Sequence, residues 1–203
     1  MNKLIERDVE SLWNKYEKLL SILDDEGVNK LIEDHGQRII ECSYSQKISE
    51  PYCGIGGLVA YSLDLAKNAK VLSQTLNYDI SAHSIIKCAL LSEVGRIGTE
   101  HLSRFILSTS DWHKEKLGQY FDWNESCPKY NVYHMSLWYI QKYKIYLSWE
   151  EWQTIMLMTS QSSEDSKFYG NHKSNLSLLL SISKDVVLKK EKDVIDGVDR
   201  VPF

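Results

Sequence analysis

The chain has 203 residues, of which 43% are hydrophobic and 26% are charged, and these values exclude a disordered protein. Its formal net charge of −4 argues against a nucleic-acid-binding protein, because phosphate contacts favour a basic surface. No run of the sequence reaches the roughly 20 apolar residues of a membrane span, and residues 1–10 are too charged for the core of a signal peptide. We therefore expect a cytoplasmic protein that makes no membrane contact.

Helical periodicity dominates the N-terminal half. Apolar residues recur every three or four positions up to Leu23, and the stripe then stops at Asp24–Gly27, which predicts one helix that ends there. A second short helix is expected from Val28 to about Ile40. The Ser-, Gly- and Pro-containing stretch that follows predicts a loop, and a third helix is expected over Gly57–Leu76.

The C-terminal half is also predicted to be helical. A fourth helix is capped by Asp79 or Ser81 and ends at Gly95 or Gly98. Residues 99–129 are polar and irregular, with one short helix around residues 112–120. Three further helices are expected over residues 132–143, 149–160 and 176–190, and the pair Ser148 and Glu151 has the spacing of a capping box.

These elements predict an all-α protein, an irregular multi-helix bundle. We expect N-terminal helices over residues 1–40 that pack on the core, a main helical domain over residues 41–188, and a polar C-terminal tail over residues 189–203. Four widely spaced cysteines contain no C-x-x-C pair, so free thiols are expected instead of a zinc site or a disulfide framework. The six histidines show no pairing that is typical of a helical metal motif.

Two polar residues stand out in the apolar run of the fourth helix. Ser92 and Glu93 fall on stripes that otherwise carry apolar side chains, so both are expected to face packed surroundings. A buried carboxylate destabilises a fold by several kcal/mol unless it is paired or binds a metal ion. Glu93 therefore needs a partner if it is buried.

Several strings of the sequence resemble the HD-domain superfamily, in particular a small phage-type branch of metal-dependent phosphohydrolases. They are IGGLVAYS (55–62), LLSEVGRIG (90–98), SDWHKEKLGQYFDWNES (110–126), YHMSLWYIQKYKIYLSWEEWQTIMLM (133–158) and LSLLLSISKDVV (176–187). The resemblance covers roughly residues 38–188 and implies an HD-domain-like bundle. It also implies that a phage or virus encodes the protein, which would then act in the host cytoplasm.

The same resemblance implies that most metal ligands of the family have been replaced. Tyr61 stands at the position of the first histidine, and Ser92 and Glu93 replace the His-Asp pair. Lys184 stands at the position of the last aspartate, although a shift by one residue would place Asp185 there. An auxiliary His-Asp pair is replaced by Met158 and Thr159, and an accessory histidine is kept as His134.

A catalytic metal site normally has three or more protein ligands, which one glutamate and one histidine do not supply. We therefore expect no catalytic residues, no bound metal and no cofactor. The expected remnant of the site is Tyr61, Ser92, Glu93, Arg96, His134, Met158, Thr159 and Lys184.

Two of these residues, Glu93 and Lys184, have more than one interpretation. Glu93 is either a buried carboxylate paired with Lys184 or Arg96, or a solvated residue at a helix end. Lys184 either joins that pair or extends to solvent. We interpret Tyr61 as a core aromatic residue that fills the former metal position and His134 as a half-buried histidine with hydrogen-bond partners.

The sequence thus predicts a catalytically inactive HD-domain-like protein that serves as a binding, scaffolding or regulatory module. A protein partner is expected, together with a nucleotide-like ligand as one occupant of the remnant pocket. The aromatic residues concentrated over residues 130–152 belong to the core or to a partner surface. The alternatives are a metal-dependent phosphohydrolase acting on nucleotides, with a site rebuilt from Glu93, His134 and a nearby aspartate, and a structural component of a larger viral assembly.

Overall fold

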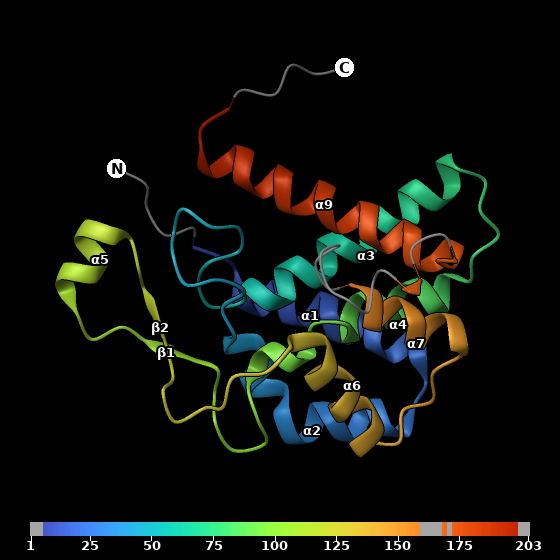
Figure 1. Cartoon of the computed structure of the whole chain (residues 1–203), viewed down its shortest axis with the longest axis horizontal. Helices are drawn as coiled ribbons and strands as arrows, with labels where there is room; N and C mark the ends of the chain where they lie inside the picture. Colours follow the sequence, from blue (N-terminus) through green and yellow to red (C-terminus); the bar gives the residue numbers. More distant parts are fainter. Residues whose placement is uncertain (1–5, 159–167, 170–171, 199–203) are drawn as a thin grey trace.

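The computed structural model describes residues 6–158, 168–169 and 172–198. Over these ranges the chain consists mainly of helices, with one small antiparallel sheet (Figure 1). The elements are α1 (Val9–Leu20), the 3₁₀ helix η1 (Ser21–Leu23), α2 (Glu26–Glu41), α3 (Gly57–Thr75), α4 (Ala82–Leu91), the 3₁₀ helix η2 (Val94–Ile97), β1 (Phe105–Leu107), α5 (Asp111–Leu117), β2 (Phe121–Trp123), α6 (Val132–Lys142), α7 (Trp149–Leu157) and α9 (Asn175–Ile195). This confirms the predicted all-α multi-helix bundle.

Helix α3 lies near the centre of the bundle. It packs against α1, α2, α4 and α9, and Figure 1 shows α9 crossing over it. The core contains aromatic residues with essentially no exposed surface, among them Tyr16, Tyr61 and Tyr139. The hydroxyl group of Tyr16 donates a 3.0 Å hydrogen bond to the carbonyl oxygen of Leu90, which joins α1 to the end of α4. Such a bond satisfies a polar group that burial would otherwise leave unpaired.

The N-terminal helices begin where acidic residues cap them. Asp25 accepts a hydrogen bond from the backbone nitrogen of Val28 at 3.0 Å, so α2 begins at Glu26 and includes Gly27. The first helical segment does stop at Asp24, which adopts a left-handed conformation (φ 45°), but the predicted start of the second helix at Val28 is two residues late. A Cβ atom at position 27 would lie 2.2 Å from the carbonyl oxygen of Tyr143, so glycine allows α2 to approach the end of α6.

The fourth helix is shorter than the sequence predicts. Helix α4 ends at Leu91, with Ser92 as its C-cap, and the chain then tightens into η2. The expected end at Gly95 or Gly98 is therefore wrong, and Glu93 lies between the two helices. Glu93 is buried at this junction, with 1% of its surface exposed.

The predicted irregular region forms an arm that projects from the bundle, at the left of Figure 1. Strands β1 and β2 pair in antiparallel register, with Phe105 opposite Trp123 and Leu107 opposite Phe121. Helix α5 lies between the strands in sequence, and Ser110 caps it. The arm also contacts the loop that follows α2, because the backbone nitrogen of Tyr120 donates to the carbonyl oxygen of Gln46 at 3.0 Å.

The two C-terminal helices follow the predicted order. Ser148 and Glu151 form the expected capping box at the start of α7, and Glu151 also lies 3.1 Å from Lys87 of α4 in a buried ion pair. The predicted end of α7 near Ser160 falls outside the described residues. Helix α9 continues to Ile195, five residues past the predicted end at Lys190, so the start of the predicted polar tail is helical.

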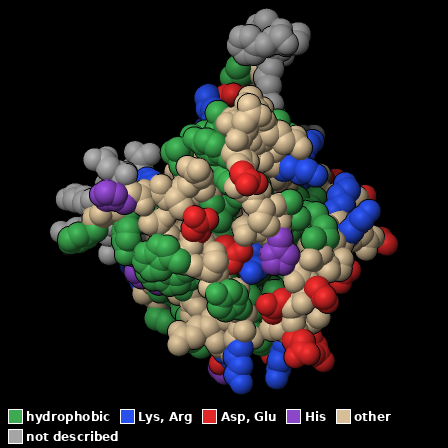
Figure 2. Space-filling view, turned by 90° about the vertical axis from the view of Figure 1, so that its right-hand side faces the viewer, with side chains coloured by type: hydrophobic (Ala, Val, Ile, Leu, Met, Phe, Trp, Pro, Cys, Tyr) green, Lys and Arg blue, Asp and Glu red, His purple; other side chains and the backbone are tan. Residues whose placement is uncertain are grey.

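Aromatic residues of the segment 130–152 lie both in the core and on the surface. Tyr133, Tyr139 and Tyr143 are buried, whereas Tyr146 and Trp149 keep 76% and 63% of their surface exposed. Figure 2 shows hydrophobic side chains gathered on one part of the face that it presents and charged side chains along another. Within the described part of the chain, no helix is long and apolar enough to cross a membrane.

Candidate functional site

The candidate site is centred on the carboxylate of Glu93. Its position depends on a close approach between η2 and α6, which Gly95 permits, since a Cβ atom there would lie 2.4 Å from the carbonyl oxygen of Val132. The hydroxyl group of Ser136 accepts a 2.9 Å hydrogen bond from the backbone nitrogen of Gly95 and fixes this contact. The side chain of Glu93 has no exposed surface.

Two cations flank this carboxylate. The Nε of Arg96 donates a short hydrogen bond to Oε2, and the Nζ of Lys184 lies 3.5 Å from Oε1. Arg96 belongs to η2 and Lys184 to α9, and their side chains are 15% and 18% exposed. Of the two interpretations of Glu93, the structure therefore has the buried ion pair, and both candidate cations take part.

Two tyrosine hydroxyl groups complete the surroundings of the carboxylate. Tyr44 and Tyr133 donate to the same Oε1 atom of Glu93 at 3.2 and 3.1 Å. Tyr133 comes from α6, and Tyr44 comes from the loop after α2, where its backbone nitrogen bonds to the carbonyl oxygen of Tyr52 at 3.2 Å. We call the set Glu93, Arg96, Lys184, Tyr44 and Tyr133 the Glu93 cluster.

The cations of the Glu93 cluster are themselves held in place. The guanidinium carbon of Arg96 lies 3.6 Å from the centre of the Tyr44 ring, and its Nη1 donates to the carbonyl oxygen of Tyr44 at 2.8 Å. The Nζ of Lys184 donates to the hydroxyl group of Tyr133 and, at 2.9 Å, to the carbonyl oxygen of Met158. Because every charged group has several partners, the cluster is a rigid unit and not one flexible ion pair.

The electrostatics of the cluster keep Glu93 ionised. Burial by itself would raise the pKa of this carboxyl, but the charges of Arg96 and Lys184 outweigh burial and lower the pKa to about 2. Burial and the Glu93 charge raise the pKa of Tyr133 well above its ordinary value, so this phenol stays neutral and donates a hydrogen bond to the carboxylate. A neutral phenol is a poor metal ligand.

The other residues expected in the remnant are also buried near the cluster or contribute to it. The Tyr61 ring packs on Tyr44 with 4.4 Å between ring centres, and its buried hydroxyl group, although outside strict hydrogen-bond geometry, faces Glu93 and helps to lower the pKa of that carboxyl. The hydroxyl group of Ser92 is likewise buried without a hydrogen-bond partner. Met158 is buried and contributes its carbonyl oxygen to Lys184, whereas Thr159 lies outside the described residues.

The structure also settles which residue of α9 faces the cluster. Lys184 does so, and Asp185 is exposed. His134 is exposed on α6, so its interpretation as a half-buried histidine is wrong; its neighbour Tyr133 reaches Glu93 instead. Among the residues that the structure describes, no group of three or more His, Cys, Asp or Glu side chains could hold a metal ion.

Sequence reasoning did not identify Tyr44 or Tyr133 as members of the site. Tyr44 lies in a stretch that the composition marks only as a loop, and no local pattern shows that its hydroxyl group meets a residue 49 positions away. Tyr133 directly precedes His134, which the family resemblance singles out. That adjacency was the available signal for Tyr133.

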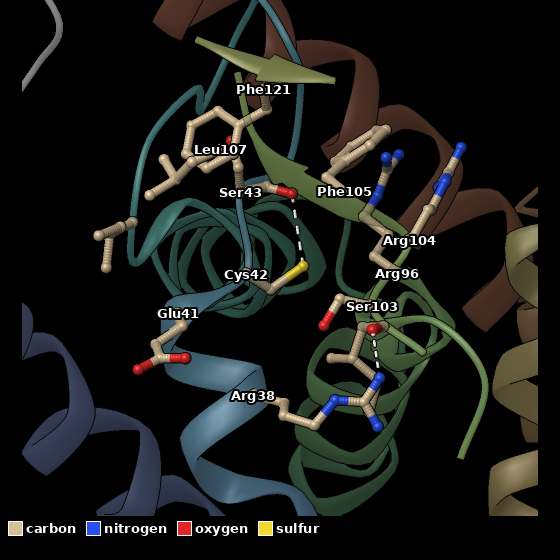
Figure 3. Close-up of a pocket in the computed structure, with 12 residues that line it drawn as sticks. Arg38, Glu41, Cys42, Ser43, Arg96, Ser103, Arg104, Phe105, Leu107 and Phe121 are labelled. Carbon is tan, nitrogen blue, oxygen red and sulfur yellow. Dashed lines mark hydrogen bonds between the residues drawn. The ribbon is translucent and has the colours of Figure 1, made fainter. Parts of the chain in front are cut away.

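A cavity of about 300 Å³ lies beside the Glu93 cluster and shares Arg96 with it (Figure 3). Three arginines line it: Arg38 from α2, Arg96 from η2 and Arg104 from the start of the arm. Burial raises the pKa of the Cys42 thiol, which also lines the cavity, to about 12, and the charges of all three arginines act against this rise. We call this space the arginine cavity.

No family model matches the chain, and neither the curated proteins nor the solved structures include a match, so comparisons with known proteins assign no role to these residues. The expected resemblance to HD domains therefore depends on the sequence strings alone.

Proposed function

We propose that the protein is a catalytically inactive, HD-domain-like binding module in which a buried ion cluster has replaced the metal centre. The observation that carries this proposal is the pair of cations on Glu93. The family resemblance assigns Ser92 and Glu93 to the metal-binding His-Asp pair, and Arg96 and Lys184 supply two positive charges at this carboxylate.

The chemistry of the cluster favours a structural role over hydrolysis. Metal-dependent hydrolysis of phosphate esters requires a dication that lowers the pKa of a bound water. Two fixed cations repel a third positive ion, and the carboxylate of Glu93 already accepts hydrogen bonds from Arg96, Tyr44 and Tyr133. Neither an ammonium nor a guanidinium group coordinates a water molecule and lowers its pKa as a metal dication does, so the cluster stabilises the fold without activating water.

The metal content of purified protein tests the proposal. We expect no stoichiometric Mg, Mn, Fe, Co, Ni or Zn by elemental analysis, and no hydrolysis of nucleotides or of a generic phosphodiester with any of these ions added. The matched control is Glu93→Gln, which removes the only carboxylate of the cluster. Bound metal with turnover in the wild type, both lost in Glu93→Gln, would instead establish the metal-dependent phosphohydrolase.

The exposed aromatic residues support a protein partner. Tyr146 and Trp149 are mostly exposed, and Trp149 stacks on Trp152 with 5.1 Å between ring centres. Tyrosine and tryptophan are enriched at the energetic centres of protein interfaces. We expect Trp149→Ser to abolish co-purification of a partner from the native source, while Trp13→Phe, in the half-buried stack with Tyr16, leaves it unchanged.

A further inference from the structure

The lining of the arginine cavity is partly charged and partly apolar. Arg38, Arg96 and Arg104 line it together with serine residues, and Phe105, Leu107 and Phe121 of the arm supply apolar surface (Figure 3). Its volume of about 300 Å³ lies at the lower end of the range for small-molecule sites. The cavity therefore combines charge and apolar surface on a small-molecule scale.

Arg38 has no carboxylate partner within the described ranges. Its guanidinium group donates to backbone carbonyl oxygens, at 2.8 Å to Ile97, 2.8 Å to Glu100 and 2.9 Å to Thr99, and its hydrogen bond with the Tyr139 hydroxyl group acts against the rise that burial causes in the pKa of that phenol. These bonds fix the side chain but leave its charge without a counter-ion. Arg96 shares its charge with Glu93, and no described acceptor bonds its Nη2.

Arg104 is the least satisfied of the three arginines. Its Nε and Nη1 atoms are buried and have no hydrogen-bond partner, and none of the described acidic residues pairs with it. The aromatic rings of Phe105 and Trp123 lie 5.0 and 5.1 Å from its guanidinium carbon and hold the group in place. Buried donors without acceptors are rare in native structures, because their lost hydration is not replaced. An anion in the cavity would supply the missing acceptors.

We propose that the arginine cavity binds a small organic phosphate, with the phosphate group between Arg38, Arg96 and Arg104 and its apolar substituent against Phe105 and Phe121. Arginine presents a planar fork of donors that matches phosphate oxygens, and a dianion balances two guanidinium charges that have no counter-ion. One acidic residue, Glu41, lines the cavity, and it accepts a hydrogen bond from Gln37. Binding there requires neither a metal ion nor hydrolysis, so it goes beyond the proposed function and can be tested separately.

Two probes test this proposal on the full-length protein, inorganic phosphate and phenyl phosphate. In titrations of ¹⁵N-labelled protein, we expect saturable shifts of the amide signals of Ser43, Ser103 and Phe105, which line the cavity. Phenyl phosphate should bind about tenfold more tightly than inorganic phosphate, because its ring buries apolar surface. Equal affinity of the two probes would overturn the assignment of the apolar surface, and an absence of saturable shifts would overturn the site.

Charge-removing variants separate specific binding from general attraction. Arg104→Gln and Arg38→Gln should each weaken phenyl phosphate by ~10-fold or more, and Arg104→Lys should weaken it less than Arg104→Gln. Lys116→Gln removes one charge from an exposed position of α5 and should leave the affinity unchanged. Since the Nε and Nη1 atoms of Arg104 have no hydrogen-bond partner among the described residues, its variants are expected to fold even if Arg38→Gln does not. Equal weakening by Lys116→Gln and Arg104→Gln would overturn the proposal.

Discussion

Removing the charges of Glu93 and Lys184 singly and together should show whether the two groups stabilise the fold as a pair. Glu93→Gln leaves Arg96 and Lys184 near each other without a counter-charge. We expect it to lower the free energy of unfolding by about 3 to 5 kcal/mol, as is typical when a buried ion cluster loses one sign of charge. Lys184→Met should have a smaller effect, because Glu93 keeps Arg96 as its partner.

The distance between Lys184 and Glu93 sets the size of the second effect. At 3.5 Å and an effective dielectric constant of about 20, two unit charges attract by about 5 kcal/mol. Desolvation of the ammonium group offsets about half of this value, so Lys184→Met should destabilise the protein by about 2 to 3 kcal/mol. In the double variant, Lys184→Met removes a cation that Glu93→Gln had already left without a counter-charge. The double variant should therefore lose about 2 kcal/mol less free energy of unfolding than the sum of the two single losses.

Urea unfolding followed by tryptophan fluorescence measures these differences, provided that all variants share the wild-type m-value. Lys189→Met is the matched control, because Lys189 lies on the same helix, its side chain is 72% exposed, and its one ion pair within the described part of the chain is with Asp193. We expect this control to stay within about 0.5 kcal/mol of the wild type. Additive effects of Glu93→Gln and Lys184→Met, or a Lys184→Met effect no larger than that of the control, would refute the reasoning.

Three other predictions concern the same region. The pKa of Glu93 lies below its ordinary value of 4.5, at about 2, so the stabilisation from its charge is complete above about pH 5 and is lost as the pH falls towards 2. The melting temperature of the wild type should therefore drop more steeply with acid than that of Glu93→Gln, corresponding to a difference of up to about 3 kcal/mol in the free energy of unfolding. Parallel curves of melting temperature against pH would contradict this. Tyr133→Phe removes a hydrogen bond to the buried carboxylate and should lower the free energy of unfolding by about 1 to 3 kcal/mol, whereas the exposed Tyr146→Phe should have no effect. Gly95→Ala would place a methyl group 2.4 Å from the carbonyl oxygen of Val132, so it should lower the free energy of unfolding by more than about 1 kcal/mol. A smaller decrease in urea unfolding would show that η2 can move away from α6 without penalty.

Local sequence patterns were sufficient to predict most of the helices. The apolar stripe up to Leu23 and the capping box of Ser148 and Glu151 act within one or two helical turns, so they are visible without any knowledge of the fold. The helix boundaries were less accurate. The sequence does not show why position 27 of α2 is glycine, because the reason is the carbonyl oxygen of Tyr143 on a distant segment.

The sequence also determined that Glu93 needed a partner, since a carboxylate on an apolar stripe requires compensation. It left open whether Arg96 or Lys184 would supply the charge. The packing of η2 and α9 decided this, because Arg96 of η2 and Lys184 of α9 both reach the buried carboxylate.

Only the tertiary structure brings together groups whose separation along the chain hides their relation. Tyr44 and Tyr133 lie in a loop and in α6, and their hydroxyl groups meet on a single carboxylate oxygen. The arginine cavity arises in the same way, from Arg38 of α2 and Arg104 of the arm. Helix formation depends on residues three or four positions apart, whereas the partners of a buried charge depend on how distant helices pack, and that information is absent from any local pattern.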